Sequence, residues 1–74
     1  MAKARDKAAV KFGKRCRKLR LDAGLSQLDM VRHHDFSLSH YQKLERGDLD
    51  PRLSTLRRLA EAYGVEVSTL VESL

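Results

Sequence analysis

Residues 26–46 read SQLDMVRHHDFSLSHYQKLER, and this stretch begins with a clear helix start signal. The Ser26 hydroxyl can accept a hydrogen bond from the backbone N–H of Asp29, and the Asp29 carboxylate can accept one from the backbone N–H of Ser26, which forms a capping box. Met30 then follows as an apolar residue that can face inward. The pattern predicts a short helix over residues 27–33.

A second helix start signal lies at Ser37, in the same stretch. After this serine, Tyr41 and Leu44 share one helical face at a spacing of three residues. We expect a helix over residues 38–45, and residues 34–36 are too few for anything except a turn. Two short helices joined in this way form a helix-turn-helix.

Helical periodicity continues on both sides of this pair. Upstream, an apolar stripe ends at Gly24, a typical residue after a helix C-terminus, and comprises Phe12, Cys16, Leu19 and Ala23. Downstream, a stronger stripe comprises Leu53, Leu56, Leu59, Ala60 and Tyr63. Ser68 is placed to cap a short last helix. The expected fold is all-α, a compact five-helix domain over residues 9–74 with a helix-turn-helix, preceded by a flexible basic arm over residues 1–8.

Charge is unevenly distributed along the 74 residues, whose net charge is +5. Residues 1–20 contain nine bases and one acid, which gives +8, and residues 21–74 contain six bases and nine acids, which gives −3. A basic segment beside a nearly neutral core is typical of a protein that binds a polyanion, although many solvated surfaces are also basic.

Several other classes of protein are disfavoured. The N-terminal stretch is charged and lacks the apolar run of a signal peptide, and no segment is long enough to span a membrane. The single cysteine, Cys16, cannot form an internal disulfide, so we expect a cytoplasmic protein. His33, His34 and His40 do not have the spacing of metal ligands, and no catalytic or cofactor motif is present, so we expect neither a metal, a cofactor nor an enzyme.

The residues around the two predicted helices resemble the helix-turn-helix domain of the phage repressor and Cro-like (XRE) regulators, the lambda repressor-like fold. The resemblance covers nearly everything after the first ten residues and rests on Gly24-Leu25-Ser26-Gln27, Met30-Val31, Phe36-Ser37, Tyr41, Leu44-Glu45-Arg46-Gly47, Pro51, Leu53, Leu56, Leu59-Ala60, Ala62 and Gly64-Val65. It implies a transcriptional regulator that binds double-stranded DNA by placing its second short helix in the major groove.

The resemblance also implies roles for individual residues. Arg20 and Glu45 correspond to an ion pair inside the domain. The positions expected to read bases are Leu38, Ser39 and Lys43, with His40 and Gln42 beside them. The positions expected to contact the DNA backbone are Gln27, with Ser26 nearby, Arg46 and Arg52, and Ser37 is also expected at the DNA.

Five residues depart from the family pattern in ways that bear on function. Asp35 stands where glycine is usual and would adopt a positive φ, which aspartate tolerates better than most residues. Asp48 and Asp50 place negative charge near the expected phosphates. Leu28 and Leu38 are apolar where polar residues are common, so an alternative is a protein-interaction module that holds a protein partner through these two leucines.

Family members usually bind DNA as twofold dimers. The apolar residues expected to make a homodimer contact lie in the last helix, because a small domain cannot bury all of them itself. They are Val67, Leu70, Val71 and Leu74.

Overall fold

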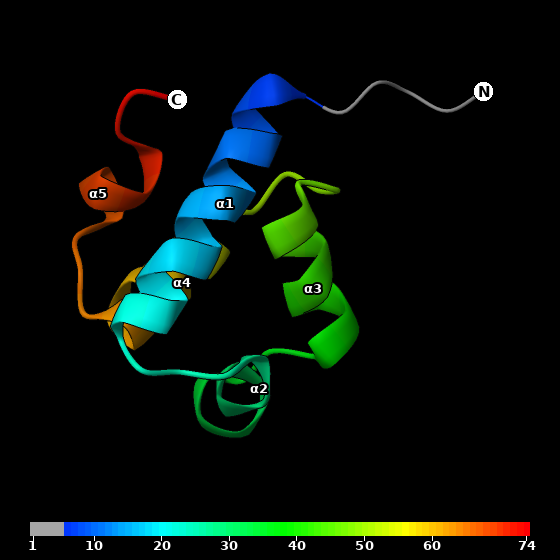
Figure 1. Ribbon diagram of the computed structural model, residues 1–74, viewed down its shortest axis with the longest axis vertical. Helices are drawn as coiled ribbons and strands as arrows, with labels where there is room; N and C mark the ends of the chain where they lie inside the picture. The colour runs from blue at the N-terminus through cyan, green and yellow to red at the C-terminus, as the bar shows by residue number, and fades with distance from the viewer. Residues whose placement is uncertain (1–5) are drawn as a thin grey trace.

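Five α-helices make up the computed structural model, which describes residues 6–74. They are α1 (Lys7–Asp22), α2 (Gln27–His34), α3 (Leu38–Arg46), α4 (Leu53–Tyr63) and α5 (Val67–Val71), and the described residues contain no strand. Figure 1 shows α1 between α3 on one side and α5 on the other, with α2 below and α4 behind. The all-α, five-helix prediction is confirmed.

The caps that define the helix-turn-helix are present as predicted. Asp29 N donates to Ser26 Oγ at 3.0 Å, and Ser26 N donates to Asp29 Oδ2 at 2.8 Å. The hydrogen bond from the Ser26 backbone also holds the pKa of the Asp29 carboxyl below its usual value. At the start of α3, the Ser37 hydroxyl accepts from His40 N at 3.1 Å. The two short helices are therefore fixed at their first turns by local hydrogen bonds.

The turn between α2 and α3 depends on Asp35, whose φ is 62°. This left-handed conformation ends α2, and the Asp35 N–H bonds back to the carbonyl of Met30. The next residue, Phe36, then turns into the core, where it is 4% exposed. The positive φ expected of Asp35 is confirmed.

The core lies between the five helices. Its fully buried members come from all five helices and are Cys16, Met30, Tyr41, Leu44, Leu59 and Leu70. Ala23, predicted as part of the inward stripe of the first helix, is exposed, because α1 ends at Asp22 and Ala23 turns away as its C-cap.

Two glycines allow α3 and its C-terminus to approach α1 closely. A Cβ on Gly13 would lie 2.5 Å from the carbonyl oxygen of Glu45 and 2.6 Å from that of Leu44. A Cβ on Gly47 would lie 2.7 Å from the Cα of Val10. Because both neighbours are backbone atoms, they cannot move aside as a flexible side chain would. Gly13 belongs to none of the motifs in the sequence, and only the docking of α1 on α3 shows its role.

The C-terminal segment is held against α1 by basic side chains. Arg15 donates to the carbonyl oxygens of Thr69, Leu70 and Glu72, which are the unpaired acceptors at the end of α5. Lys11 Nζ donates to the carbonyl of Ser73 at 2.7 Å. These contacts dock α5 on α1.

Two expectations for the chain ends need adjustment. Ser68 lies inside α5 and does not cap it, since Glu66 occupies the cap position. At the other end, α1 begins at Lys7 with the Asp6 side chain as its cap, so Lys7 and Ala8 of the expected arm are helical. The rest of that arm, residues 1–5, lies outside the described residues. Within residues 6–74, no helix combines the length and the apolar composition that a membrane crossing requires.

We predict that Gly13→Ala destabilises the domain. Alanine favours a helix over glycine by about 1 kcal/mol, yet the added methyl would overlap the backbone of α3. The expected net loss is about 1–3 kcal/mol of unfolding free energy, measured by urea denaturation. The control is Gly24→Ala, because a Cβ at Gly24 would meet nothing within 4 Å. The only cost of that substitution comes from the positive φ of 75° at Gly24. A Gly13→Ala protein as stable as the wild type would contradict the close approach.

Candidate nucleic-acid interface

The outer face of α3 is formed by residues that point away from the core. Successive residues of a helix are about 100° apart, so the buried Tyr41 and Leu44 define the inner side of α3. The residues on the opposite side, exposed or half-buried, are Leu38, Ser39, Gln42, Lys43 and Arg46. We call this set the outer face of α3.

His40 does not lie on the outer face. It lies on the side of α3 nearest Leu44, and its ring stacks on the ring of Phe36 with the ring centroids 6.1 Å apart. The guanidinium of Arg58 lies over the same Phe36 ring at 4.5 Å and donates to the carbonyl of Asp35 at 2.8 Å. His40 therefore supports the turn between α2 and α3, and the structure separates it from the other predicted base-reading residues.

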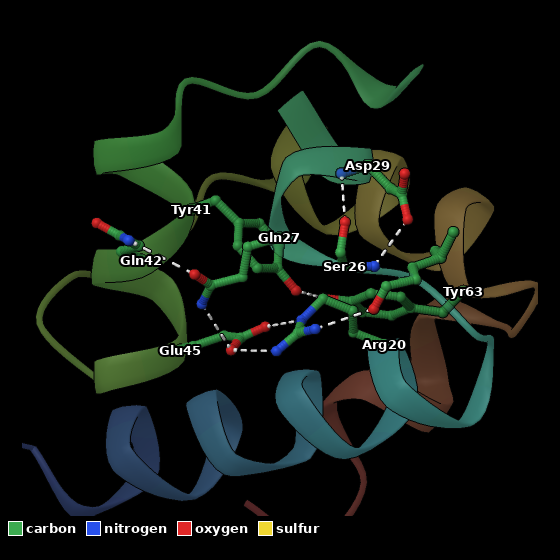
Figure 2. A network of polar contacts seen from close by, with 9 residues as sticks. Arg20, Ser26, Gln27, Asp29, Tyr41, Gln42, Glu45 and Tyr63 are labelled. Carbon is green, nitrogen blue, oxygen red and sulfur yellow. Dashed lines mark hydrogen bonds and ion pairs between the residues drawn. The ribbon is translucent and has the colours of Figure 1, made fainter. Parts of the chain in front are cut away.

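Arg20 and Glu45 form a nearly buried ion pair between α1 and α3. Arg20 Nε lies 2.7 Å from Glu45 Oε2 and Nη2 lies 3.2 Å from Oε1, with only 8% and 6% of the two side chains exposed. Arg20 Nη1 also donates to the carbonyl of Leu25 at 2.9 Å, just before α2. This is the pair that the resemblance implies, and it joins three segments of the domain (Figure 2).

The ionised state of this pair is maintained by hydrogen bonds. Burial by itself would raise the pKa of Glu45, but hydrogen bonds from Arg20, Tyr41 and Gln27 outweigh it and hold that pKa below the usual 4.5. The hydrogen bond to Glu45 raises the pKa of Arg20. Glu45 is therefore a carboxylate at neutral pH.

A chain of buried hydroxyls extends from Glu45 into the core. The hydroxyls of Tyr41 and Tyr63 lie 2.6 Å apart, and burial raises the pKa of both. Burial also raises the pKa of the Cys16 thiol to about 12, so Cys16 remains a thiol at neutral pH. Within residues 6–74 no group of three or more potential ligands could hold a metal ion.

Gln27, predicted as a phosphate contact, begins α2 and also joins this network. Its Nε2 donates to Glu45 Oε1 at 3.2 Å, and its Oε1 accepts from Gln42 Nε2 at 3.5 Å (Figure 2). Ser26 and Ser37 are exposed at the starts of α2 and α3, where each hydroxyl already serves as a cap. The structure thus links Gln27 to the outer face of α3.

Several charged side chains lie at the end of α3 or on the elements next to it. Arg46 is exposed and pairs with Asp48 at 3.1 Å, and Arg52 is exposed at the cap position of α4. Lys7 and Lys14 were not singled out in the sequence. They flank Val10 on α1, and Val10 packs against Gly47 at the end of α3. Only the docking of α1 on α3 brings these two lysines near the predicted site.

The exposed apolar residues that the sequence singled out lie in two places. Leu28 on α2 and Leu38 on α3 are 49% and 38% exposed. Near the C-terminus, Val71 and Leu74 are 41% and 44% exposed and line a hollow that Phe12, Pro51 and Leu56 also line. Leu70, expected as a dimer contact, is fully buried because α5 turns it into the core, so that expectation is corrected. Val67 is half-buried against the same core.

Comparison with known proteins agrees with this architecture. A family model described as a helix-turn-helix domain matches residues 11–74. The chain is 37% identical over 65 residues to the HTH-type transcriptional regulator DdrOP3 of Deinococcus deserti, covering 88% of this chain and 50% of that protein. In general, the chain spans about half the length of the curated relatives that it matches.

Solved structures give the same result. The restriction-modification controller protein C.AhdI from Aeromonas hydrophila is 35% identical with a TM-score of 0.78, over 84% of this chain and 94% of that chain. The BldD DNA-binding domain of S. venezulae is 28% identical with a TM-score of 0.77, over 89% of this chain and 99% of that chain.

We predict that Glu45→Gln lowers stability at neutral pH by roughly 3 kcal/mol, because it leaves the buried Arg20 without its counter-charge. The folded-state pKa of Glu45 is lowered, so the contribution of its charge is present above pH 4.5 and is lost as the pH falls through the folded value. The difference in unfolding free energy between the wild type and Glu45→Gln should therefore decrease below pH 4.5. Urea unfolding measured from pH 7 to pH 3 tests this. Glu61→Gln, at an exposed carboxylate on α4, is the matched control. A gap that stays constant with pH would contradict this assignment.

Proposed function

The chain belongs to the helix-turn-helix domain family, and from that membership we propose that it is a sequence-specific DNA-binding transcriptional regulator that docks α3 in the major groove. The observation that carries the proposal is the outer face of α3, whose side chains are polar or basic except for Leu38, on a helix anchored by a buried ion pair. The family relative DdrOP3 is itself named a transcriptional regulator.

Base reading is assigned to the exposed residues of the outer face. A major groove about 12 Å wide admits one α-helix. The ammonium of Lys43 can donate to O6 and N7 of guanine, and the hydroxyl of Ser39 can donate or accept. Leu38, at the front of α3, can contact the methyl group of thymine. His40 is left out of this set because its ring is stacked on Phe36.

Backbone contacts are assigned to groups around the outer face. Arg46 is exposed at the end of the outer face, Arg52 is exposed at the start of α4, and the start of α2 at Ser26 and Gln27 presents backbone N–H groups that suit a phosphate. Lys7 and Lys14 on α1 extend the positive surface past the end of α3. These groups would position the domain on the duplex without reading its sequence.

A homodimer contact is proposed at the exposed apolar residues near the C-terminus. Val71 and Leu74 are the exposed members of the predicted set, and Leu53, at the start of α4, is 68% exposed. Val67 can contribute its accessible edge, whereas Leu70 cannot contribute. A twofold arrangement of such contacts would present two copies of α3 to a palindromic site.

A second candidate function is a protein-interaction module on the same fold. The observation in its favour is the exposure of Leu28 and Leu38, which would be covered by an apolar protein partner. The two functions differ in their response to salt, because DNA binding releases counterions and an apolar contact does not.

We predict that Lys43→Ala and Arg46→Ala both weaken binding to a duplex selected from a random library. Loss of Lys43 should reduce discrimination at one base pair by about tenfold, and loss of Arg46 should weaken binding to all duplexes and reduce the salt slope by about one. Fluorescence anisotropy at several salt concentrations measures both effects.

Lys18→Ala is the charge-matched control for this experiment. Lys18 is exposed, pairs with Asp22, and lies two residues from Arg20 and so on the opposite side of α1 from α3. Its loss should change affinity only slightly. Unchanged affinity in Lys43→Ala and Arg46→Ala would show that α3 does not read DNA, and partner binding lost in Leu28→Ala would support the protein-interaction module.

We also predict that Val71→Asp abolishes self-association by placing a carboxylate in the proposed apolar contact. Analytical ultracentrifugation without DNA should show a dimer for the wild type and a monomer for this variant. Leu21→Asp introduces the same charge at another exposed apolar side chain, 49% accessible on α1, and should remain dimeric. A wild-type protein that is monomeric at high concentration would refute the homodimer.

A further inference from the structure

Gln42 lies at the middle of the outer face of α3, and the two ends of its amide are chemically different. The oxygen only accepts hydrogen bonds, and the nitrogen only donates them. A glutamine side chain without a partner can exchange the two ends by rotation about its last bond. Whatever fixes this rotation also fixes which edge of a base the residue can recognise.

The orientation of both glutamine amides is determined first by Glu45, which Gln27 contacts. Paired with Arg20, Glu45 is an ionised carboxylate and therefore only accepts hydrogen bonds. The part of Gln27 that reaches Glu45 Oε1, at 3.2 Å, must then be its NH₂ group. The opposite orientation would place two acceptors face to face at the same distance.

The orientation of Gln27 in turn determines that of Gln42. With its NH₂ group toward Glu45, Gln27 presents Oε1 to Gln42, and Gln42 Nε2 donates to it at 3.5 Å. Figure 2 shows the oxygen of Gln42 directed away from Gln27. All the hydrogen bonds from Gln42 through Gln27 to Glu45 thus run in one direction, toward the buried pair.

The groups left over on Gln42 match one base. Its Oε1 remains an acceptor, and one N–H remains a donor. In the major groove adenine presents the N6 amino donor beside the N7 acceptor, which complements this pair, whereas guanine presents two acceptors. Resting on the proposed function, we propose that Gln42 reads an adenine, and that Gln27 is a positioning residue that fixes the Gln42 amide for this reading through its bond to Glu45.

The test uses duplexes selected from a random library by the whole chain. Gln42→Ala first identifies the base pair that Gln42 contacts, where the wild type should favour adenine by about tenfold. Gln27→Met keeps the length of the side chain but removes the acceptor that fixes Gln42. It should reduce the adenine preference by about fivefold, the equivalent of one hydrogen bond, and leave the preference at the Lys43 base pair unchanged.

Gln27→Glu separates positioning from stability. Its carboxylate can still accept from Gln42, although it lies against Glu45 and should lower the stability of the fold more than methionine does. We expect Gln27→Glu to keep the adenine preference while it loses stability, and Gln27→Met to lose the preference.

The outcomes separate this inference from the proposed function. If no duplex is enriched by the wild type, the DNA-binding function itself is refuted. If a site is enriched but the base at the Gln42 position is not adenine, or Gln27→Met keeps its full preference, the positioning role is refuted while DNA binding stands. An equal loss of preference in Gln27→Glu and Gln27→Met would also refute it.

Discussion

The buried pair between Arg20 and Glu45 is the interaction on which the rest of the structure depends. It is made by α1 and α3, and the same guanidinium bonds to the carbonyl of Leu25 ahead of α2. A buried pair adds little net stability compared with apolar side chains of the same size, but each partner is costly to leave alone. Its main effect here is to fix how the three segments are arranged, because a carboxylate and a guanidinium can satisfy each other's hydrogen bonds in only a few of their arrangements.

Other contacts also hold α3 in this arrangement against α1 and α4. Gly13 lets the backbone of α3 at Leu44 and Glu45 approach α1, and Gly47 lets the end of α3 approach Val10. On the inner side, the hydroxyl of Tyr41 meets that of Tyr63 from α4. Because α3 is held by backbone contacts and by polar contacts, its outer face is presented as one rigid unit. Such preorganisation reduces the entropy that binding must overcome.

The sequence predicts the local features of the fold well and the contacts between helices less well. The serine caps, the positive φ of Asp35 and the inner positions Tyr41 and Leu44 follow from hydrogen bonding and periodicity within a few residues. By contrast, the stacking of His40 on Phe36, the burial of Leu70 and the bond between Gln27 and Gln42 depend on how separate helices dock. Spacing along one helix gives no information on such contacts, so they could not be predicted from the sequence.

The charges near α3 indicate how such a surface could achieve selectivity. Arg46 is paired with Asp48 at 3.1 Å, and Asp50 adds a further acid in the same loop. These carboxylates reduce the general attraction to phosphate, which contributes to every DNA sequence equally. If α3 binds DNA as proposed, its outer face would have less non-specific affinity for DNA than Lys43 and Arg46 alone would give. The strength of an oriented hydrogen bond from a polar side chain depends on the base that it meets. When the attraction to phosphate is weaker, such bonds make up a larger share of the binding energy, and that share distinguishes one DNA sequence from another.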